Sequence, residues 1–170
     1  AENPQVLAQH LQQLRRQRNE LQNQYLSIGS GFKFESFQAI LDKRTAIIEW
    51  YILDDEILAF IIKSVGEITV WQSQPEDLEA FIDWENQYLT DYHNQKEQWR
   101  NQLEERLQKL AEILHIEEIL ARISKDFNRL ILIPHRSLHP LPLHALPVGE
   151  SYLIDLFPKG VTYVPSCQLL

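Results

Sequence analysis

Residues 129–134 read Arg-Leu-Ile-Leu-Ile-Pro, a nearly all-apolar run of the kind that forms a buried strand in the middle of a parallel sheet. The segment before it, residues 95–123, has apolar residues at steps of four and three, which predicts an amphipathic helix. This apolar stripe consists of Trp99, Leu103, Leu107, Leu110 and Leu114. A helix followed by a buried strand is typical of the α/β class, and residues 160–164 have the composition of a further short strand.

Three β-branched and aromatic runs precede this helix. They cover residues 46–53, 56–63 and 67–72, and only Asp54-Asp55 separates the first two, which predicts a hairpin. We therefore expect an amino-terminal β-meander that belongs to a mixed sheet and has apolar residues on both faces. The spacing of Ser73-Gln-Pro-Glu76 is that of a capping box, and it predicts the start of another long amphipathic helix.

The first 30 residues differ from the rest of the chain. Apolar residues recur at helical spacing over residues 4–26, and two glycines in Ser27-Ile-Gly-Ser-Gly31 end the pattern. Arg18 occupies one of the core positions, which favours docking onto a neighbouring helix or domain over a coiled coil. The chain is thus predicted to consist of an amphipathic linker helix, residues 1–30, and a domain, residues 31–170.

The charge balance excludes several classes of partner. The chain has 24 acidic and 16 basic side chains and a net charge of -8, which repels the phosphate backbone of nucleic acid.

No apolar run approaches the roughly 20 residues that span a bilayer. The single cysteine, Cys167, excludes an internal disulfide. Because no signal-peptide pattern is present, we expect a cytoplasmic protein without nucleic-acid or membrane partners.

Three histidines within ten residues raise the question of a metal site. His135, His139 and His144 follow one another at steps of four and five, and imidazoles at such steps align only on a helix. Pro140 and Pro142 forbid a helix there. The sequence therefore favours an ordered, leucine-anchored loop with structural histidines, and we expect neither a metal nor another cofactor.

Other candidate chemistry is equally incomplete. Cys167 has no histidine at a fixed distance, and Ser137 and Ser166 lack the Gly-x-Ser-x-Gly elbow of serine hydrolases. Gly29-Ser-Gly31 follows no strand, so a nucleotide site is not indicated. Asp54-Asp55 are expected to be solvated turn carboxylates. The residues alone show no complete active site.

The loop that begins at Pro134 is still the place where a ligand would bind, because sites in α/β sheets lie at the carboxyl ends of parallel strands. Arg136 suits a carboxylate partner, since its guanidinium makes bidentate pairs. We take Arg136 and His139 as candidate residues of a substrate-adjacent loop. The alternative is that Arg136 is a surface arginine without a specific partner.

Four segments of the carboxyl-terminal half resemble a known family in their order. These are Leu130-Ile-Leu-Ile-Pro134, Leu138-His-Pro-Leu-Pro-Leu-His-Ala-Leu146, Tyr152-Leu-Ile-Asp155 and Val161-Thr-Tyr-Val-Pro-Ser166. Together they resemble the opening of the CHAT domain, the caspase-like peptidase module often found behind TPR repeats. The strands and helices before them resemble the segment that precedes this loop in the family, and residues 7–26 resemble the helix that links TPR repeats to the domain.

The resemblance implies a partial caspase-like sandwich and cysteine peptidase chemistry based on a His/Cys dyad. In the family that dyad lies downstream of the Tyr-x-Pro-Ser strand end, so the resemblance gives no catalytic role to His139 or Cys167. Where the family often has Asp-Gly after the strand-end proline, this chain has His135-Arg136. Residues 31–170 would then be the amino-terminal part of a CHAT domain, truncated before the dyad and inactive alone.

We therefore expect a non-catalytic portion of a caspase-like cysteine peptidase that contributes core strands and a wall of the substrate cleft. Its partners would be the remaining carboxyl-terminal part of the domain, TPR repeats upstream, and a peptide or protein substrate. The alternative is a protein-interaction scaffold, or inactive pseudo-peptidase. A third possibility is an independent small enzyme that uses Cys167.

Overall fold

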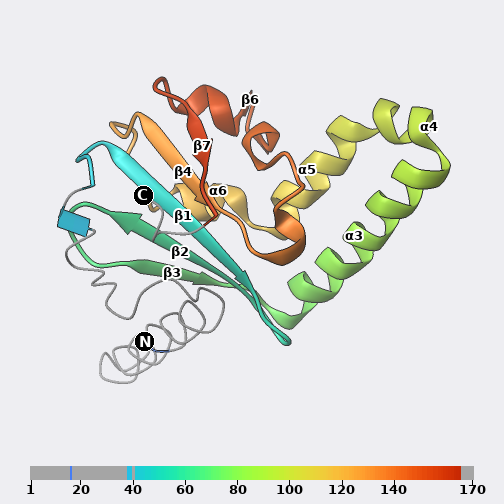
Figure 1. The fold of residues 1–170 in the computed structure, drawn as a ribbon, viewed down its shortest axis with the longest axis horizontal. Helices are drawn as coiled ribbons and strands as arrows, with labels where there is room; N and C mark the ends of the chain where they lie inside the picture. Colours follow the sequence, from blue (N-terminus) through green and yellow to red (C-terminus); the bar gives the residue numbers. More distant parts are fainter. Residues whose placement is uncertain (1–15, 17–37, 40, 166–170) are drawn as a thin grey trace. The chain divides into compact units, whose positions relative to one another are not determined.

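The computed structural model describes residues 16, 38, 39 and 41–165, and it has a mixed α/β fold built on a five-stranded sheet of order β3-β2-β1-β4-β7 (Figure 1). The strands are β1 (Thr45–Ile52), β2 (Ile57–Lys63), β3 (Thr69–Gln72), β4 (Arg129–Ile133) and β7 (Val161–Tyr163). Strands β1, β2 and β3 pair antiparallel, whereas β4 pairs parallel with both β1 and β7. The predicted mixed sheet with an amino-terminal meander is confirmed.

The contacts divide the chain into two compact units, Ala1–Phe34 and Glu35–Leu170. The linker helix predicted for residues 1–30 falls almost wholly outside the described residues, and the following paragraphs concern the second unit.

Strand β1 lies at the centre of the sheet, and all eight of its residues are buried. Register places Ile48 opposite Ile61 of β2 and Leu132 of β4 on one face, while Ile47 lies opposite Ile62 and Ile131 on the other. A strand that is buried on both faces requires apolar residues at nearly every position, because alternation would put polar side chains into one of the two layers.

The long helical region between β3 and β4 consists of α3 (Pro75–Asn94), α4 (Lys96–Asn101), α5 (Leu103–Ile113) and α6 (Ile116–Leu120). Helix α3 begins one residue later than predicted. Its N-cap is Gln74, whose partner in the capping box is Asp77. The hydroxyl of Ser73 instead accepts a 2.8 Å hydrogen bond from the backbone N–H of Ile57 in β2. Because of this contact with the strand, Ser73 does not cap the helix.

The prediction of one continuous helix over residues 95–123 is wrong. The helix is interrupted at Gln102 and again at Leu114 and His115, where His115 has a left-handed backbone with φ 48°. The Nε2 atom of His115 lies 2.8 Å from Oδ1 of Asp77, and its ring lies 5.3 Å from that of Trp71. These tertiary contacts hold a backbone conformation that helical periodicity does not reveal.

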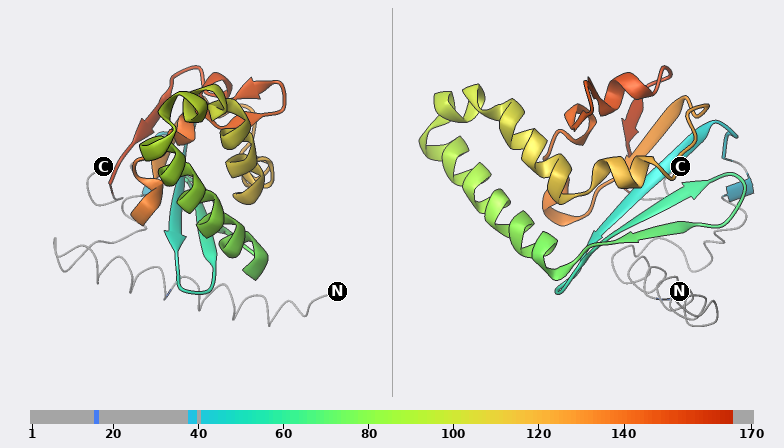
Figure 2. Two further views of the ribbon diagram at one scale, coloured as in Figure 1. Left: turned by 90° about the vertical axis from the view of Figure 1, so that its right-hand side faces the viewer. Right: turned by 180° about the vertical axis from the view of Figure 1, so that it is seen from behind.

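Helices α3 and α5 form an antiparallel hairpin that extends away from the sheet (Figure 2). Arg106 of α5 pairs with Asp91 of α3 at 2.5 Å, and Nε1 of Trp84 donates to the carbonyl oxygen of Arg106 at 2.9 Å. The amide of Gln87 and the guanidinium of Arg106 hold the pKa of Asp91 below its usual value by hydrogen bonding to its carboxylate. The ion pair and the indole bond thus fix the distance between the two helices.

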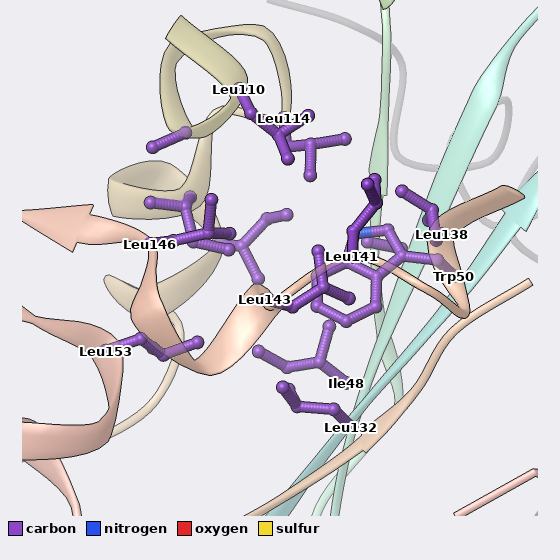
Figure 3. Packing of buried hydrophobic residues seen from close by; sticks show 14 of the residues in the cluster. Ile48, Trp50, Leu110, Leu114, Leu132, Leu138, Leu141, Leu143, Leu146 and Leu153 are labelled. Atoms are coloured by element: carbon purple, nitrogen blue, oxygen red, sulfur yellow. The ribbon is translucent and has the colours of Figure 1, made fainter. Parts of the chain in front are cut away.

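The segment between β4 and β7 covers the helix-facing side of the sheet. It contains the short helices η1 (Arg136–Leu138), η2 (Leu143–Ala145) and η3 (Leu153–Leu156) and the hairpin of β5 (Pro147–Val148) and β6 (Ser151–Tyr152). Figure 3 shows side chains of this segment around Trp50, Ile48 and Leu132 of the sheet. The residues that it buries are Leu138, Leu141, Leu143, Leu146, Leu153 and Phe157. The predicted leucine-anchored loop is confirmed.

In the described part of the chain, no helix combines the length and the apolar character needed to cross a membrane.

The buried leucines of this loop predict a matched pair of stability effects. We expect Leu143→Ala to lower the free energy of unfolding by roughly 2 to 4 kcal/mol, because Leu143 is 0% exposed and truncation leaves a cavity between loop and sheet. Leu156, in the same segment, is 41% exposed, and Leu156→Ala should change the free energy by less than about 0.5 kcal/mol. Urea unfolding measures both, and equal effects would contradict the proposed packing.

Candidate functional site

The candidate site lies where the parallel strands end. Strand β1 pairs with β4 as far as Glu49 and Ile133, and then continues for three more residues to Ile52. Residues of the next segment, from Pro134 onward, therefore meet the free edge of β1 rather than another strand. This is the edge of an α/β sheet at which ligands commonly bind.

His135 satisfies the backbone of β1 beyond the end of β4. Its Nδ1 atom accepts a 3.0 Å hydrogen bond from the backbone N–H of Ile52. The alternation of β4 places His135 on the same face as Ile131 and Ile133, and its ring centroid lies 5.2 Å from that of Tyr51. The imidazole thus takes the place that the carbonyl of a longer β4 would occupy.

The same face of β1 contains a buried carboxylate. Glu49 is 2% exposed, and Oε1 of Glu49 accepts a 3.0 Å hydrogen bond from the hydroxyl of Tyr51, which is also buried. The ring of Tyr51 packs edge-on against Phe60, with centroids 5.8 Å apart, and also contacts the tilted ring of His135. A carboxylate in such a layer must be hydrogen-bonded, because an unpaired buried charge costs several kcal/mol.

The protonation of His135 follows from this environment. The pKa of His135 is lowered from 6.5 to about 4, chiefly by burial and to a lesser extent by the charges of Arg136 and His139, while the carboxylate of Glu49 works in the opposite direction. Because Nδ1 accepts the hydrogen bond from Ile52 N–H, the proton of the neutral ring is on Nε2. His135 is therefore a neutral hydrogen-bond donor at neutral pH, and Nδ1 is not available as a general base.

The structure places the two predicted site residues, Arg136 and His139, directly after β4, at the start and the C-cap of η1. Both side chains are exposed. Arg136 has a left-handed backbone with φ 49°, which is rare for a residue other than glycine. Such a conformation is maintained only where surrounding contacts fix it, and here it turns the chain from β4 into the leucine-anchored loop.

The three loop histidines do not form one cluster. The backbone N–H of His144 donates to the hydroxyl of Tyr163 at 2.8 Å, and its Nδ1 lies 2.8 Å from the same oxygen. His135 contacts β1, and His139 is exposed. Among the residues that the structure describes, no three His, Cys, Asp or Glu side chains are placed to hold a metal ion. Cys167 and Ser166 lie outside the described residues, and Ser137 is half-buried within η1.

Sequence reasoning missed Glu49 and Tyr51. Glu49 interrupts an otherwise apolar strand, which is the one signal that could have marked it. Its proximity to His135 depends on the β1–β4 register, and the sequence does not give that register.

Neither the known protein-family profiles nor the curated proteins contain a match to this chain.

The acceptor role of His135 predicts a specific pH dependence. Between pH 6.5 and about 4 the unfolded chain binds more protons at this residue than the native state does, so the free energy of unfolding falls as the pH decreases through that window. We expect this residue to account for a loss of roughly 1 to 2 kcal/mol, after allowance for partial exposure of the ring.

Urea unfolding at pH 7.5 and pH 4.5 tests this expectation, with His135→Gln as the principal variant. The Gln side chain still offers an oxygen to Ile52 N–H but does not titrate, so the variant should lose less stability than the wild type. His139→Gln is the matched control and should retain most of the pH dependence of the wild type, because burial of His135, and not the charge of His139, is the main cause of the lowered pKa. A His135→Gln variant with that same dependence would rule out titration of His135 as the cause.

Proposed function

We propose that this chain is the non-catalytic amino-terminal portion of a caspase-like CHAT cysteine peptidase. The proposal is supported by the order of the four motif segments on the fold. They fall on β4, on the leucine-anchored loop, on β6 with η3, and on β7, and the loop packs against the sheet rather than away from it. One sheet layer covered by helices and by this loop is compatible with half of an α/β sandwich.

The observation that carries the proposal is the position of β7. It pairs in parallel with β4 and is the last strand of the five-stranded sheet. Tyr163 of β7 is 37% exposed, and Ile154 and Leu156 of the η3 helix, which precedes β7 in the sequence, are 43% and 41% exposed. An edge strand favours pairing with a further strand, and the remaining carboxyl-terminal part of the domain is the partner that we propose.

In this arrangement Arg136 and His139 would form one wall of the substrate cleft. They lie at the carboxyl ends of β1 and β4, on a turn whose backbone is fixed by the His135–Ile52 hydrogen bond. The histidine and cysteine of the dyad would come from the carboxyl-terminal part, since the Nδ1 atom of His135 already has a donor. TPR repeats upstream and a peptide or protein substrate complete the proposed set of partners.

A protein-interaction scaffold is the second candidate. It is favoured by the outer face of α3, on which Ile82, Leu89 and Tyr92 are 47%, 42% and 39% exposed. Apolar residues at this spacing on one helix face form a surface for a partner protein.

Activity measurements separate these candidates. We expect the 170-residue chain alone to cleave no member of a fluorogenic peptide library. We further expect the protein purified from its native source to have an intact mass above 20.1 kDa, or to carry a second chain with a histidine and a cysteine motif. Native protein that is a lone chain of this mass would overturn the peptidase proposal and leave the scaffold.

A cysteine variant provides the control. In active native protein, Cys167→Ser should leave kcat/KM within about twofold of the wild type, because the nucleophile lies elsewhere. Loss of an activity that the 170-residue chain shows by itself, on alkylation of Cys167, would instead establish the independent enzyme.

A further inference from the structure

A concave surface lies at the start of helix α3, and no described residue of the loop after β4 lines it. It is a pocket of about 700 Å³ between the turn that joins β1 to β2, the end of β3 and the first turns of α3. Its lining comprises Asp54, Asp55, Glu56, Gln72, Ser73, Gln74, Pro75, Leu78, Glu79 and Ile82. A volume of this size is in the range of ligand-binding pockets.

The pocket has an apolar floor that continues along a helix face. Leu78 is buried in the core beneath it, whereas Ile82, one turn further along α3, is 47% exposed. The next apolar residue on this face, Leu89, lies two turns beyond Ile82 and is 42% exposed. Neither of these two side chains contributes to the buried cluster between helices and sheet. An apolar strip of this kind beside a pocket marks a contact surface for another molecule.

The charges around the floor are of one sign. Asp54, Asp55, Glu56 and Glu79 line the pocket, and none of its described lining residues is lysine or arginine. The carboxylate of Glu56 accepts a hydrogen bond from the amide of Gln72, which holds it at the rim. Asp54 and Asp55, in contrast, project from an exposed turn. The chain as a whole has a net charge of -8, so the negative electrostatic potential of the whole chain adds to that of the pocket carboxylates.

We propose that this pocket and the adjoining face of α3 are a docking surface for a protein segment in which basic and apolar side chains alternate. The apolar side chains contact Ile82 and the floor at Leu78, and the basic side chains pair with the carboxylates of the rim. Charge complementarity selects this occupant, because an acidic or neutral segment would leave the rim carboxylates partly desolvated without a counter-charge. The proposal does not rest on peptidase activity and applies equally to a scaffold.

The chemistry requires both features together. Surface ion pairs alone contribute little and are screened by salt. An apolar strip alone would bind segments of any charge. A segment that alternates lysine with leucine should therefore bind more tightly than an all-lysine peptide of equal length, and a peptide with glutamate in place of lysine should not bind.

Fluorescence anisotropy with the 170-residue chain and a fluorescein-labelled lysine–leucine peptide tests the proposal. We expect the combined variant Asp54→Asn, Asp55→Asn, Glu79→Gln to raise the Kd about tenfold. Ile82→Ser should raise it about threefold, because part of the apolar contact is lost. Binding should also weaken as NaCl rises from about 0.05 M to about 0.5 M. All four positions are exposed, so circular dichroism should show unchanged folding.

Asp83→Asn is the matched control. Asp83 is exposed on the same helix but does not line the pocket, so its removal should change the Kd by less than about twofold. Three results would overturn the proposal. They are no binding of the lysine–leucine peptide, an unchanged Kd in the combined variant, and an increase in Kd with Asp83→Asn as large as that with the combined variant. Equal binding of the all-lysine peptide would also overturn the proposal, since it would show that net charge alone accounts for the binding.

Discussion

The hydrogen bonds of β1 are the constraint on which the rest of the structure depends. All eight residues of this strand are buried, so both of its backbone edges must find partners within the protein. The antiparallel meander satisfies one edge, and β4 satisfies the other in parallel. A parallel partner requires a long connection. The connection from β1 to β4 runs through β2, β3 and helices α3 to α6, and the helices cover one face of the sheet.

The geometry of the candidate site follows from a mismatch in strand length. Because β4 ends before β1 does, an imidazole completes the ladder at Ile52, and the cost of burying that imidazole keeps it neutral. The adjacent turn takes a left-handed backbone at Arg136 and leads the chain into the leucine-anchored loop. The position of the exposed arginine is therefore a consequence of how the sheet edge is closed.

Local patterns in the sequence predicted most of the fold. Three strands of the meander, the strand at residues 129–133 and the buried leucines of the loop all follow from residue type and spacing. The break at His115 and the cap at Gln74 could not be predicted, because contacts with Asp77 and with β2 decide them. The same holds for the cluster of Glu49, Tyr51 and His135. Its members come together only through the β1–β4 register, which is a long-range property.

The parallel pairing of β1 with β4 also has a consequence for synthesis of the chain. Strand β4 begins 84 residues after β1 begins, so at about 5 to 20 residues per second the second edge of β1 waits roughly 4 to 17 seconds for its partner. The meander and the α3–α5 hairpin involve close neighbours in sequence and form far sooner. During that interval the nascent chain exposes an unpaired, aggregation-prone strand, and a chaperone that shields extended apolar segments would act on it there.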